Sequence, residues 1–314
     1  MSYEKELEKF CQKHPDALVL TAENRALIRN LPGVLGSRFV DTGITEQTMV
    51  GMAAGLALQG RRVVCHALAA FLTMRAFEFV RTDVGIPGLP VKFTGFIPGL
   101  LSDANGATHQ AIEDMALMLG IPGMEVYCPA DLEDMLLMCQ AVWESPKPAY
   151  LRAVHLSSGL QHKPYVPGLA EWMLEGPADV VFLVAGMLLP EVMKAASILE
   201  KSGIRVAVAN MRSLRPLDEH ALRQACTWGA LVVCVEDHFQ RGGLTSLFKE
   251  WLAENMGSLQ ASGTSLPEVM SISLGHSWFT PGLLADVLRH HRLLGEDVAE
   301  RVLAWRKERP MAEA

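Results

Sequence analysis

One carboxylate, Glu46, follows a short turn and stands at the expected start of a helix, within residues 41–60 (DTGITEQTMVGMAAGLALQG). Small side chains follow it along that helix: Gly51, Ala53, Ala54, Gly55 and Ala57. A run of small residues permits a close approach between this helix and another surface. The helix dipole alone also favours an acid at a helix N-terminus, so spacing by itself favours a structural role for Glu46.

A second candidate is the histidine of a polar, glycine-containing loop. Residues 100–124 read LLSDANGATHQAIEDMALMLGIPGM, so that Thr108, His109 and Gln110 directly precede a predicted helix. Imidazole titrates near neutral pH, and loops carry a disproportionate share of binding and catalytic residues. His109 is therefore a better functional candidate than a histidine on an apolar core face would be.

Two further segments have structural interpretations. Residues 67–81 (ALAAFLTMRAFEFVR) place Leu68, Phe71 and a later phenylalanine at helical spacing, which periodicity alone assigns to a core face. The triplet Glu236-Asp237-His238 has the composition of a metal or catalytic site. A strand end followed by a Gly-Gly helix start explains the triplet equally well, and we favour that interpretation.

Short β-rich runs alternate with helical periods along the chain, a pattern typical of parallel sheets flanked by helices. In the first half we expect strands at residues 17–21, 62–66, 91–94, 125–128 and 149–153, and helices at 46–59, 73–83, 111–119 and 132–144. In the second half we expect strands at residues 180–185, 205–209, 231–236 and 269–273, and helices at 190–201, 218–226, after Gly243 and at 281–289.

The periodicity breaks between the two halves, where Ser, Gly and Pro accumulate: Ser157, Ser158, Gly159, Pro164, Pro167, Gly168 and Pro177. Such breakers indicate a linker. We therefore expect an α/β protein of two domains, each a mainly parallel sheet flanked by helices. Their boundaries are residues 1–155 and 178–314, with residues 156–177 as the linker.

Composition excludes several classes of function. The chain of 314 residues has a net charge of −7, which disfavours nucleic acid as a partner and requires local cations for any anionic substrate. Its six cysteines form no C-x-x-C pair, so we expect free thiols of a reducing cytosol rather than a zinc or redox site. We expect no signal peptide and no membrane span, and hence a cytoplasmic protein.

Taken together, these segments resemble the transketolase family. Residues 43–60 are similar to the family's G-I-x-E-x-x-M-x-x-x-A-x-G-x-A-x-x-G, and residues 68–81 to its F-x-x-F-x-x-R-A-x-[DE]-x-x-R. Residues 105–131 (NGATHQAIEDMALMLGIPGMEVYCPAD) match most positions of its segment D-G-x-[TS]-H-Q-x-x-E-D-x-A-x-x-R-x-I-P-x-x-x-V-x-x-P-A-D. MRSLRPLDEHAL and VEDHFQRGGL look like its C-terminal domain. The resemblance runs in order from about residue 15 to residue 287.

The resemblance implies a thiamine-diphosphate pyrimidine-binding fold followed by a transketolase C-terminal domain. Full-length members also carry a diphosphate-binding domain with a G-D-G motif, which this sequence lacks. The resemblance therefore implies an N-terminal diphosphate-binding partner subunit that holds Mg²⁺, with no metal ligands on this chain. We expect an α2β2 assembly with a homodimer contact through this chain, because the cofactor would bridge two chains and oligomers favour two-fold symmetry.

The resemblance also implies roles for single residues. Glu46 matches the family glutamate that hydrogen-bonds the pyrimidine ring nitrogen, and Phe71 matches the aromatic that stacks on the pyrimidine, with Leu68 beside it in the cofactor site. His109 matches a histidine that contacts the bound substrate. Glu23 stands roughly where the family has an Asp, although this alignment is weaker. Glu46 and His109 are thus the expected catalytic residues.

Three positions depart from the family pattern. Ile97, Asn105 and His155 stand where sugar-phosphate enzymes usually have His, Asp and Arg. A phosphate is best held by a fixed arginine fork, so a neutral imidazole is a poor replacement. We therefore expect Asn105, His109 and His155 at the substrate, with an acceptor that needs no strong phosphate anchor. Other cations leave the alternative open: Arg152, Lys92, His162, Lys163 or a residue of the partner.

Three functions are compatible with this sequence. The first is transfer of a two-carbon ketol or acyl unit from a ketose to an aldehyde, by a split transketolase-like enzyme. The second is the β subunit of a 2-oxo acid dehydrogenase E1 component, a family whose β subunit has the same two domains. The third is a non-catalytic binding protein of this fold. The wording T-H-Q-x-I-E-D favours the first, and retention of Glu46, Phe71 and His109 disfavours the third.

Overall fold

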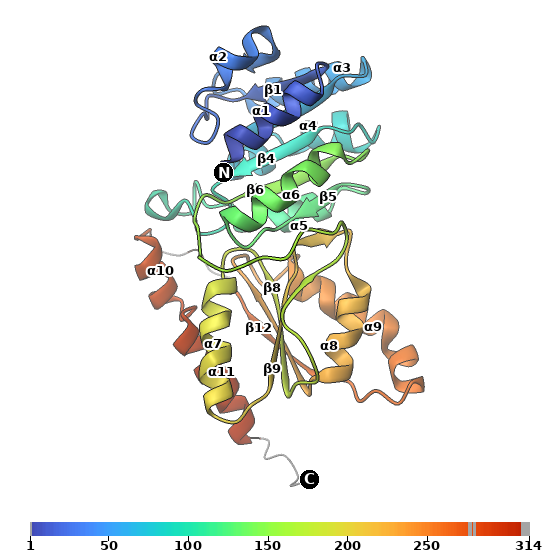
Figure 1. The fold of residues 1–314 in the computed structure, drawn as a ribbon, viewed down its shortest axis with the longest axis vertical. Helices are drawn as coiled ribbons and strands as arrows, with labels where there is room; N and C mark the ends of the chain where they lie inside the picture. The colour runs from blue at the N-terminus through green and yellow to red at the C-terminus, as the bar shows by residue number, and fades with distance from the viewer. Residues whose placement is uncertain (1, 276–277, 279–280, 309–314) are drawn as a thin grey trace.

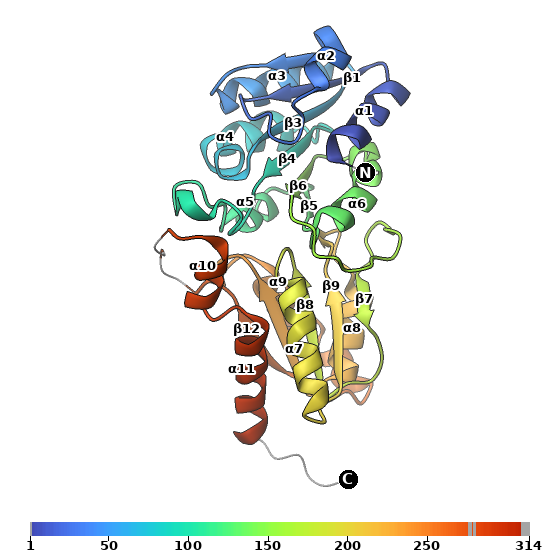
Figure 2. The same cartoon turned by 60° about the vertical axis from the view of Figure 1, so that its left-hand side comes forward.

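The computed structural model describes residues 2–275, 278 and 281–308, and it contains two sheets placed end to end (Figure 1). The first half of the chain forms the upper part of the view and the second half the lower part, with helices on both faces of each sheet (Figures 1 and 2). Residues 309–314 of the expected second domain lie outside the described residues.

The first sheet has seven strands in the order β10-β5-β6-β4-β3-β1-β2. Its strands from the first half are β1 (Ala17–Thr21), β2 (Phe39–Asp41), β3 (Arg62–Leu68), β4 (Lys92–Phe96), β5 (Glu125–Tyr127) and β6 (Ala149–Ala153). Its helices are α1 (Tyr3–Lys13), α2 (Leu31–Leu35), α3 (Glu46–Leu58), α4 (Phe77–Phe79), α5 (Asp114–Leu119) and α6 (Leu132–Glu144). All five strands expected here are confirmed, and three-residue β2 is an addition.

The second sheet has five strands in the order β12-β11-β8-β9-β7. Its strands are β7 (Glu171–Leu174), β8 (Val180–Ala185), β9 (Val206–Asn210), β11 (Leu231–Glu236) and β12 (Glu268–Ile272). Helices α7 (Leu189–Lys201), α8 (Glu219–Trp228), α9 (Leu244–Ala261), α10 (Leu284–His290) and α11 (Gly295–Glu308) accompany it. The two-sheet α/β expectation is confirmed, because among the strands of the described residues only β7 and β10 (Ser213–Arg215) pair antiparallel with their neighbours.

Two expected helices differ from the structure. In place of one helix at residues 73–83, α4 lies between two π-helical turns, Phe71–Arg75 and Val80–Gly85. The helix expected from residue 111 begins only at Asp114, because Ala111 instead forms a bridge with Gly99. π-helical turns are frequent at functional sites, and the first of these turns carries Phe71.

The segment expected as a linker is more ordered than its composition predicts. It contributes β7 to the second sheet, and the second half in turn contributes β10 to the first sheet. The two halves are therefore interleaved. The breakers in residues 156–177 end the helical periodicity, but they leave room for a short edge strand.

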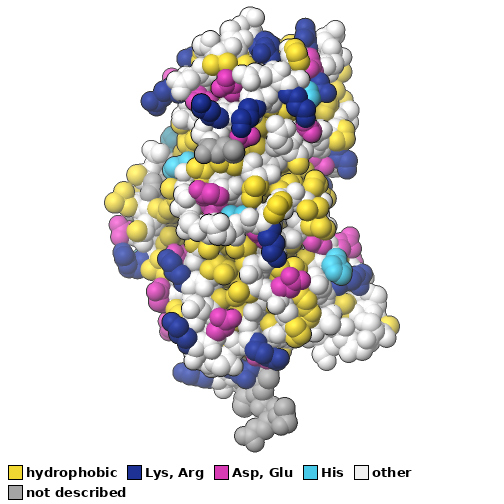
Figure 3. All heavy atoms as spheres, in the orientation of Figure 1, with side chains coloured by type: hydrophobic (Ala, Val, Ile, Leu, Met, Phe, Trp, Pro, Cys, Tyr) yellow, Lys and Arg dark blue, Asp and Glu magenta, His cyan; other side chains and the backbone are white. Residues whose placement is uncertain are grey.

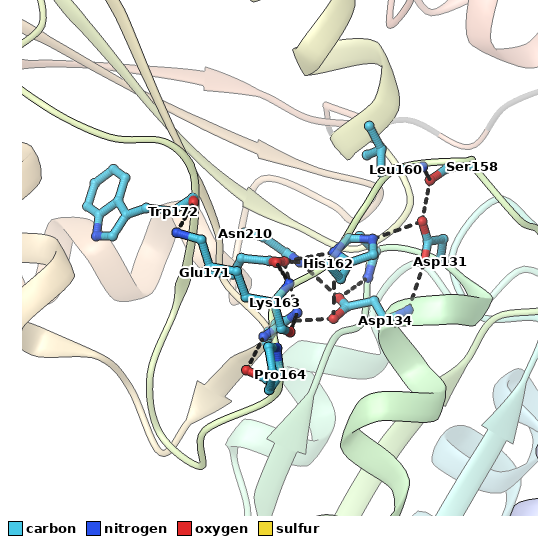
Figure 4. Close-up of polar contacts among 12 residues, drawn as sticks. Asp131, Asp134, Ser158, Leu160, His162, Lys163, Pro164, Glu171, Trp172 and Asn210 are labelled. Atoms are coloured by element: carbon cyan, nitrogen blue, oxygen red, sulfur yellow. Dashed lines mark hydrogen bonds and ion pairs between the residues drawn. The ribbon is translucent and has the colours of Figure 1, made fainter.

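A buried ion-pair cluster fixes this segment at the junction of the two halves (Figure 4). His162 Nδ1 lies 2.8 Å from Glu171 and Nε2 lies 3.0 Å from Asp131, while Arg212 lies 2.7 Å from Asp134 and 2.9 Å from Glu171. Burial by itself would lower the pKa of His162, but hydrogen bonds to Asp131 and Glu171 outweigh it and raise that pKa to about 10.

His162, Asp134 and Glu171 have the spacing of a metal site, since one ligand atom from each lies within 4.8 Å of the others. A metal needs a neutral imidazole and free carboxylate oxygens. Here the raised pKa of His162 favours the protonated imidazole, and Arg212 lies against both carboxylates. The geometry is therefore that of an ion-pair network.

Candidate active site at the ends of the first sheet

Glu46 is the first residue of α3, and its side chain is only 2% exposed. The short β2 leads into the turn that delivers it there, and the turn includes Gly43 with a positive φ of 70°. Its Oε2 accepts a 2.8 Å hydrogen bond from Nη1 of Arg75. The N-terminal end of the helix dipole adds to this stabilisation of the carboxylate.

Phe71 links Glu46 to His109 through Arg75. The guanidinium carbon of Arg75 lies 4.1 Å from the centroid of the Phe71 ring, which is cation–π geometry. The imidazole of His109 meets the same ring edge-on, with centroids 5.0 Å apart and planes at 66°. Glu46, Arg75, Phe71 and His109 thus form one continuous set, drawn from α3, a π-helical turn and the loop before α5.

Arg75 had no role in the sequence-based prediction, although it belongs to the R-A position of the resembled motif. It stands four residues after Phe71, so both side chains emerge on one side of the turn. Leu68 ends β3 three residues before Phe71, and its side chain is partly exposed. Glu23 is exposed with a φ of 66°, and its backbone N–H donates to Asp41.

The loop before α5 carries His109 and Asn105 in different surroundings. Nδ1 of His109 lies 2.9 Å from the hydroxyl of Thr108. Asn105 is exposed, and its amide donates to Ser102 at 3.1 Å. Gln110, the residue after His109, is fully buried, and neither polar atom of its amide has a partner among the described residues. A buried, unsatisfied amide beside His109 is costly unless a ligand or water reaches it.

His155 lies apart from His109 in the described contacts. It follows β6, is exposed, and its ring lies 5.6 Å from that of Phe96. It lines a cavity of about 420 Å³ together with Arg29, Asn30 and Tyr3. Ile97, directly after β4, has a φ of 49°, a rare conformation for a β-branched residue.

The other cations considered as phosphate ligands are engaged elsewhere. Nζ of Lys92 donates to the backbone carbonyls of Ser145 and Lys147, and burial lowers the pKa of Lys92 to about 8. Nζ of Lys163 donates to the carbonyl of Trp172 at 3.0 Å. His162 belongs to the junction cluster described above, and Arg152 lies in a buried ion pair with Asp114 and Asp237.

The triplet Glu236-Asp237-His238 lies where the favoured interpretation expects it. Glu236 ends β11, and α9 begins after Gly242 and Gly243. The Glu236 carboxylate accepts hydrogen bonds from the first backbone N–H groups of α9, at Leu244 and Thr245. The six cysteines are also free and buried, as expected.

Comparison with known proteins identifies the family. Residues 4–156 match the model of the transketolase pyrimidine-binding domain, and residues 170–272 match that of the transketolase C-terminal domain. The 6-deoxy-6-sulfo-D-fructose transketolase subunit SqwH of Clostridium sp. (strain MSTE9) is 34% identical over 257 residues, covering 79% of each chain. The chain belongs to the transketolase family.

Other transketolase relatives have the same extent. An apulose-4-phosphate transketolase subunit of Phocaeicola vulgatus is 29% identical over 263 residues, covering 81% of this chain and 83% of that protein. A solved structure described as a split gene transketolase, inactive β4 tetramer, is 29% identical with a TM-score of 0.82, covering 96% of this chain and 95% of that one. These relatives favour a split transketolase subunit over an E1 β subunit.

Proposed function

We propose that this chain is the C-terminal subunit of a split transketolase-like enzyme that depends on thiamine diphosphate and transfers a two-carbon unit to an aldehyde acceptor. The observation that carries the proposal is the continuous set of Glu46, Arg75, Phe71 and His109 in a member of this family. A buried carboxylate, an aromatic face and an imidazole together supply what an aminopyrimidine and a carbonyl substrate require.

The residues present fit the aminopyrimidine. The planar guanidinium of Arg75 already stacks on Phe71 while it donates to Glu46. A flat ring with nitrogen groups at its edge satisfies the same two partners. The unsatisfied amide of Gln110 beside His109 further supports the approach of a polar ligand. When bound, thiamine diphosphate supplies the carbon centre that carries the two-carbon unit.

Each residue then has a distinct task. Glu46 holds or shares a proton at the pyrimidine ring nitrogen, and its burial keeps water from competing for that hydrogen bond. Phe71 supports the flat face of the ring, and Leu68 lines the site beside it. His109 contacts the substrate and orients its polar groups for the reaction. Glu46 and His109 are the catalytic residues of this proposal.

A diphosphate-binding subunit completes the site in this proposal and carries the Mg²⁺ ligands. Apolar side chains exposed around α3 and the neighbouring α4 support such a contact: Ile44, Met52, Leu58, Phe79 and Ile86. α3 also buries apolar residues, so it is apolar on both sides, as expected for a helix covered by another chain. The β4 tetramer of the structural relative supports contacts between copies of this chain.

We propose an α2β2 assembly with a homodimer contact through this chain. On the face in Figure 3, hydrophobic side chains are interspersed with charged ones, which is compatible with a subunit that also meets solvent. Residues 1–155 and 178–314 are the two domains of this proposal, joined by residues 156–177.

A cytoplasmic location is supported by the free cysteines. Among the described residues, no helix combines the length and apolarity needed to cross a membrane.

The proposed substrates are a ketose donor and an aldehyde acceptor that is held without a strong phosphate anchor. Supporting this, Ile97, Asn105 and His155 offer no arginine fork. The two relatives are named for different sugars. One is a 6-deoxy-6-sulfo-D-fructose transketolase subunit and the other an apulose-4-phosphate transketolase subunit, so the name includes a phosphate in only one of these two cases.

Reconstitution tests the proposal. The purified chain is combined with a G-D-G-containing transketolase subunit, thiamine diphosphate and Mg²⁺, and ketol transfer between unphosphorylated and phosphorylated sugars is followed. We expect turnover only when both subunits are present, with a native mass of two copies of each. Turnover by this chain alone, or a stable monomer in the complete mixture, would contradict the proposal.

A further inference from the structure

The end of β11 and the three residues after it, Glu236 to Phe239, contact the first half of the chain at the loop that carries His109. The N–H of Phe239 donates to the carbonyl of Ile112 at 2.9 Å. Nε2 of His238 accepts from the N–H of Ala116 at 3.3 Å. We call these four residues the 236–239 segment. Both hydrogen bonds join it to backbone groups of the first half.

Asp237 adds a buried ion pair at the same place. Arg152 at the end of β6 lies between Asp114 Oδ2, 2.9 Å from Nε, and Asp237 Oδ1, 2.8 Å from Nη1. Asp114 is the first residue of α5, five positions after His109. Space for this pair depends on Gly99, because a Cβ atom there would lie 1.7 Å from Oδ2 of Asp237.

His238 is held in one tautomer. Burial lowers the pKa of His238, which favours the neutral ring. Its Nδ1 lies 2.7 Å from the carbonyl of Phe239 and therefore carries the proton, leaving Nε2 free to accept from Ala116. A glutamine has an acceptor oxygen at similar reach, whereas a phenylalanine of similar shape has none.

The His109 loop depends on these contacts for its position. Only Gln110 and Ala111 separate His109 from Ile112, and Ala111 accepts from Gly99 at 2.8 Å. On the other side of His109, Gly106 has a φ of 72°, and a Cβ atom there would lie 2.3 Å from Pro281 of the second half. Phe239 on one side of His109 and Pro281 on the other thus hold the loop, and both lie more than 120 positions later in the chain.

We propose that Asp237 and His238 are positioning residues that fix the His109 loop, and so the imidazole, beside Phe71. This inference rests on the proposed function, in which His109 contacts the substrate. The second domain then tunes the substrate end of the site, while Glu46 and Phe71 are placed by α3 and the π-helical turn. The two ends of the site are therefore separable by substitution.

The test compares His238→Phe with His238→Gln in the complete two-subunit enzyme with thiamine diphosphate and Mg²⁺. Four quantities are measured: amide hydrogen exchange of residues 105–116, exchange of the C2 proton of the bound cofactor, and kcat and KM for a ketose donor. In His238→Phe we expect loop amides to exchange at least about tenfold faster and kcat to fall about tenfold to a hundredfold, since small misplacements cost this much.

C2 proton exchange should stay within about twofold of the wild-type rate, and His238→Gln should restore most of the loss. Equal losses in C2 exchange and turnover, unchanged loop amides, or no rescue by glutamine would overturn the inference. If His238→Phe does not fold, Asp237→Asn is measured instead. It keeps the side-chain shape but removes one charge from the ion pair with Arg152, so we expect faster loop amides and a lower kcat at unchanged C2 exchange. A wild-type complex without C2 exchange would refute the proposed function instead, while the loop amides still report on the segment.

Discussion

Arg152 and Arg75 each pair with a buried carboxylate of the first sheet, yet their surroundings differ. Arg152 is 2% exposed and lies between two buried carboxylates, Asp114 and Asp237. Arg75 is 37% exposed, and the one carboxylate that it pairs with in the described part of the chain is Glu46. The first pair joins two halves of this chain, whereas the second opens toward solvent at the candidate active site.

The difference separates what the chain completes by itself from what it leaves open. A buried ion pair needs every charge matched within the fold, because desolvation is costly. The guanidinium of Arg75 is partly exposed, so water can solvate this cation when a ligand takes its place beside the buried carboxylate of Glu46. The ion pair of Arg152 is thus complete within this chain. The site around Glu46 is left open to a ligand.

The largest expected effect is the loss of stability when the ion pair of Arg152 is broken. Arg152→Met should lower the free energy of unfolding by about 3–5 kcal/mol, because it leaves Asp114 and Asp237 buried without a partner. Arg75→Met should cost less, about 1–3 kcal/mol, because it leaves the single buried carboxylate of Glu46 without its partner. Urea unfolding of the isolated chain measures both. Similar losses in the two variants would remove the distinction between the regions.

The next effect is on chemistry rather than stability. Glu46→Gln should reduce turnover of the two-subunit enzyme by at least about a hundredfold, the lower end of general acid–base contributions. Cofactor affinity should fall less, because the partner holds the diphosphate in the proposed assembly. C2 proton exchange of the bound cofactor isolates the step, and the exposed Glu200 on α7, away from the proposed partner contact, provides the control Glu200→Gln. Unchanged exchange in Glu46→Gln would refute the role assigned to this residue.

Sequence patterns predicted the elements whose signals are local. β1, β6 and α6 have the expected bounds, because apolar runs and turn residues mark their ends. The π-helical turn that carries Phe71 was missed, since its apolar spacing is close to that of an α-helix. Strands β7 and β10 were missed because three or four residues at an edge give almost no periodic signal.

The candidate site divides in the same way. Glu46, Phe71 and His109 were chosen from motifs, and the fold brings them together with Arg75. The ion pair of Arg152 with Asp237 joins residues 85 positions apart, and no local spacing encodes such a pairing. For the same reason Arg152 was considered as a phosphate ligand, although folding buries it.

The smallest and most discriminating effect concerns His155, which belongs to neither region. His155→Arg should shift kcat/KM toward a phosphorylated aldose by about tenfold to a hundredfold relative to its unphosphorylated counterpart, since a charged hydrogen-bond pair contributes roughly 1.5–3 kcal/mol. The residue is exposed and lines the cavity of about 420 Å³, so an arginine side chain has room there. The exposed His220 on α8 supplies the control His220→Arg.

Arg29 makes this prediction decisive, because it is the arginine among the described residues that line the same cavity as His155. If Arg29 already anchors a phosphate, the wild-type enzyme prefers the phosphorylated acceptor by about a hundredfold or more, and Arg29→Ala abolishes that preference. That result would defeat the expectation of an acceptor without a strong phosphate anchor. Near-equal kcat/KM for the two acceptors in the wild type, unchanged by Arg29→Ala and shifted toward phosphate by His155→Arg, would establish it. The departure at residue 155 would then be what sets acceptor choice, independently of Glu46 and of the junction at Arg152.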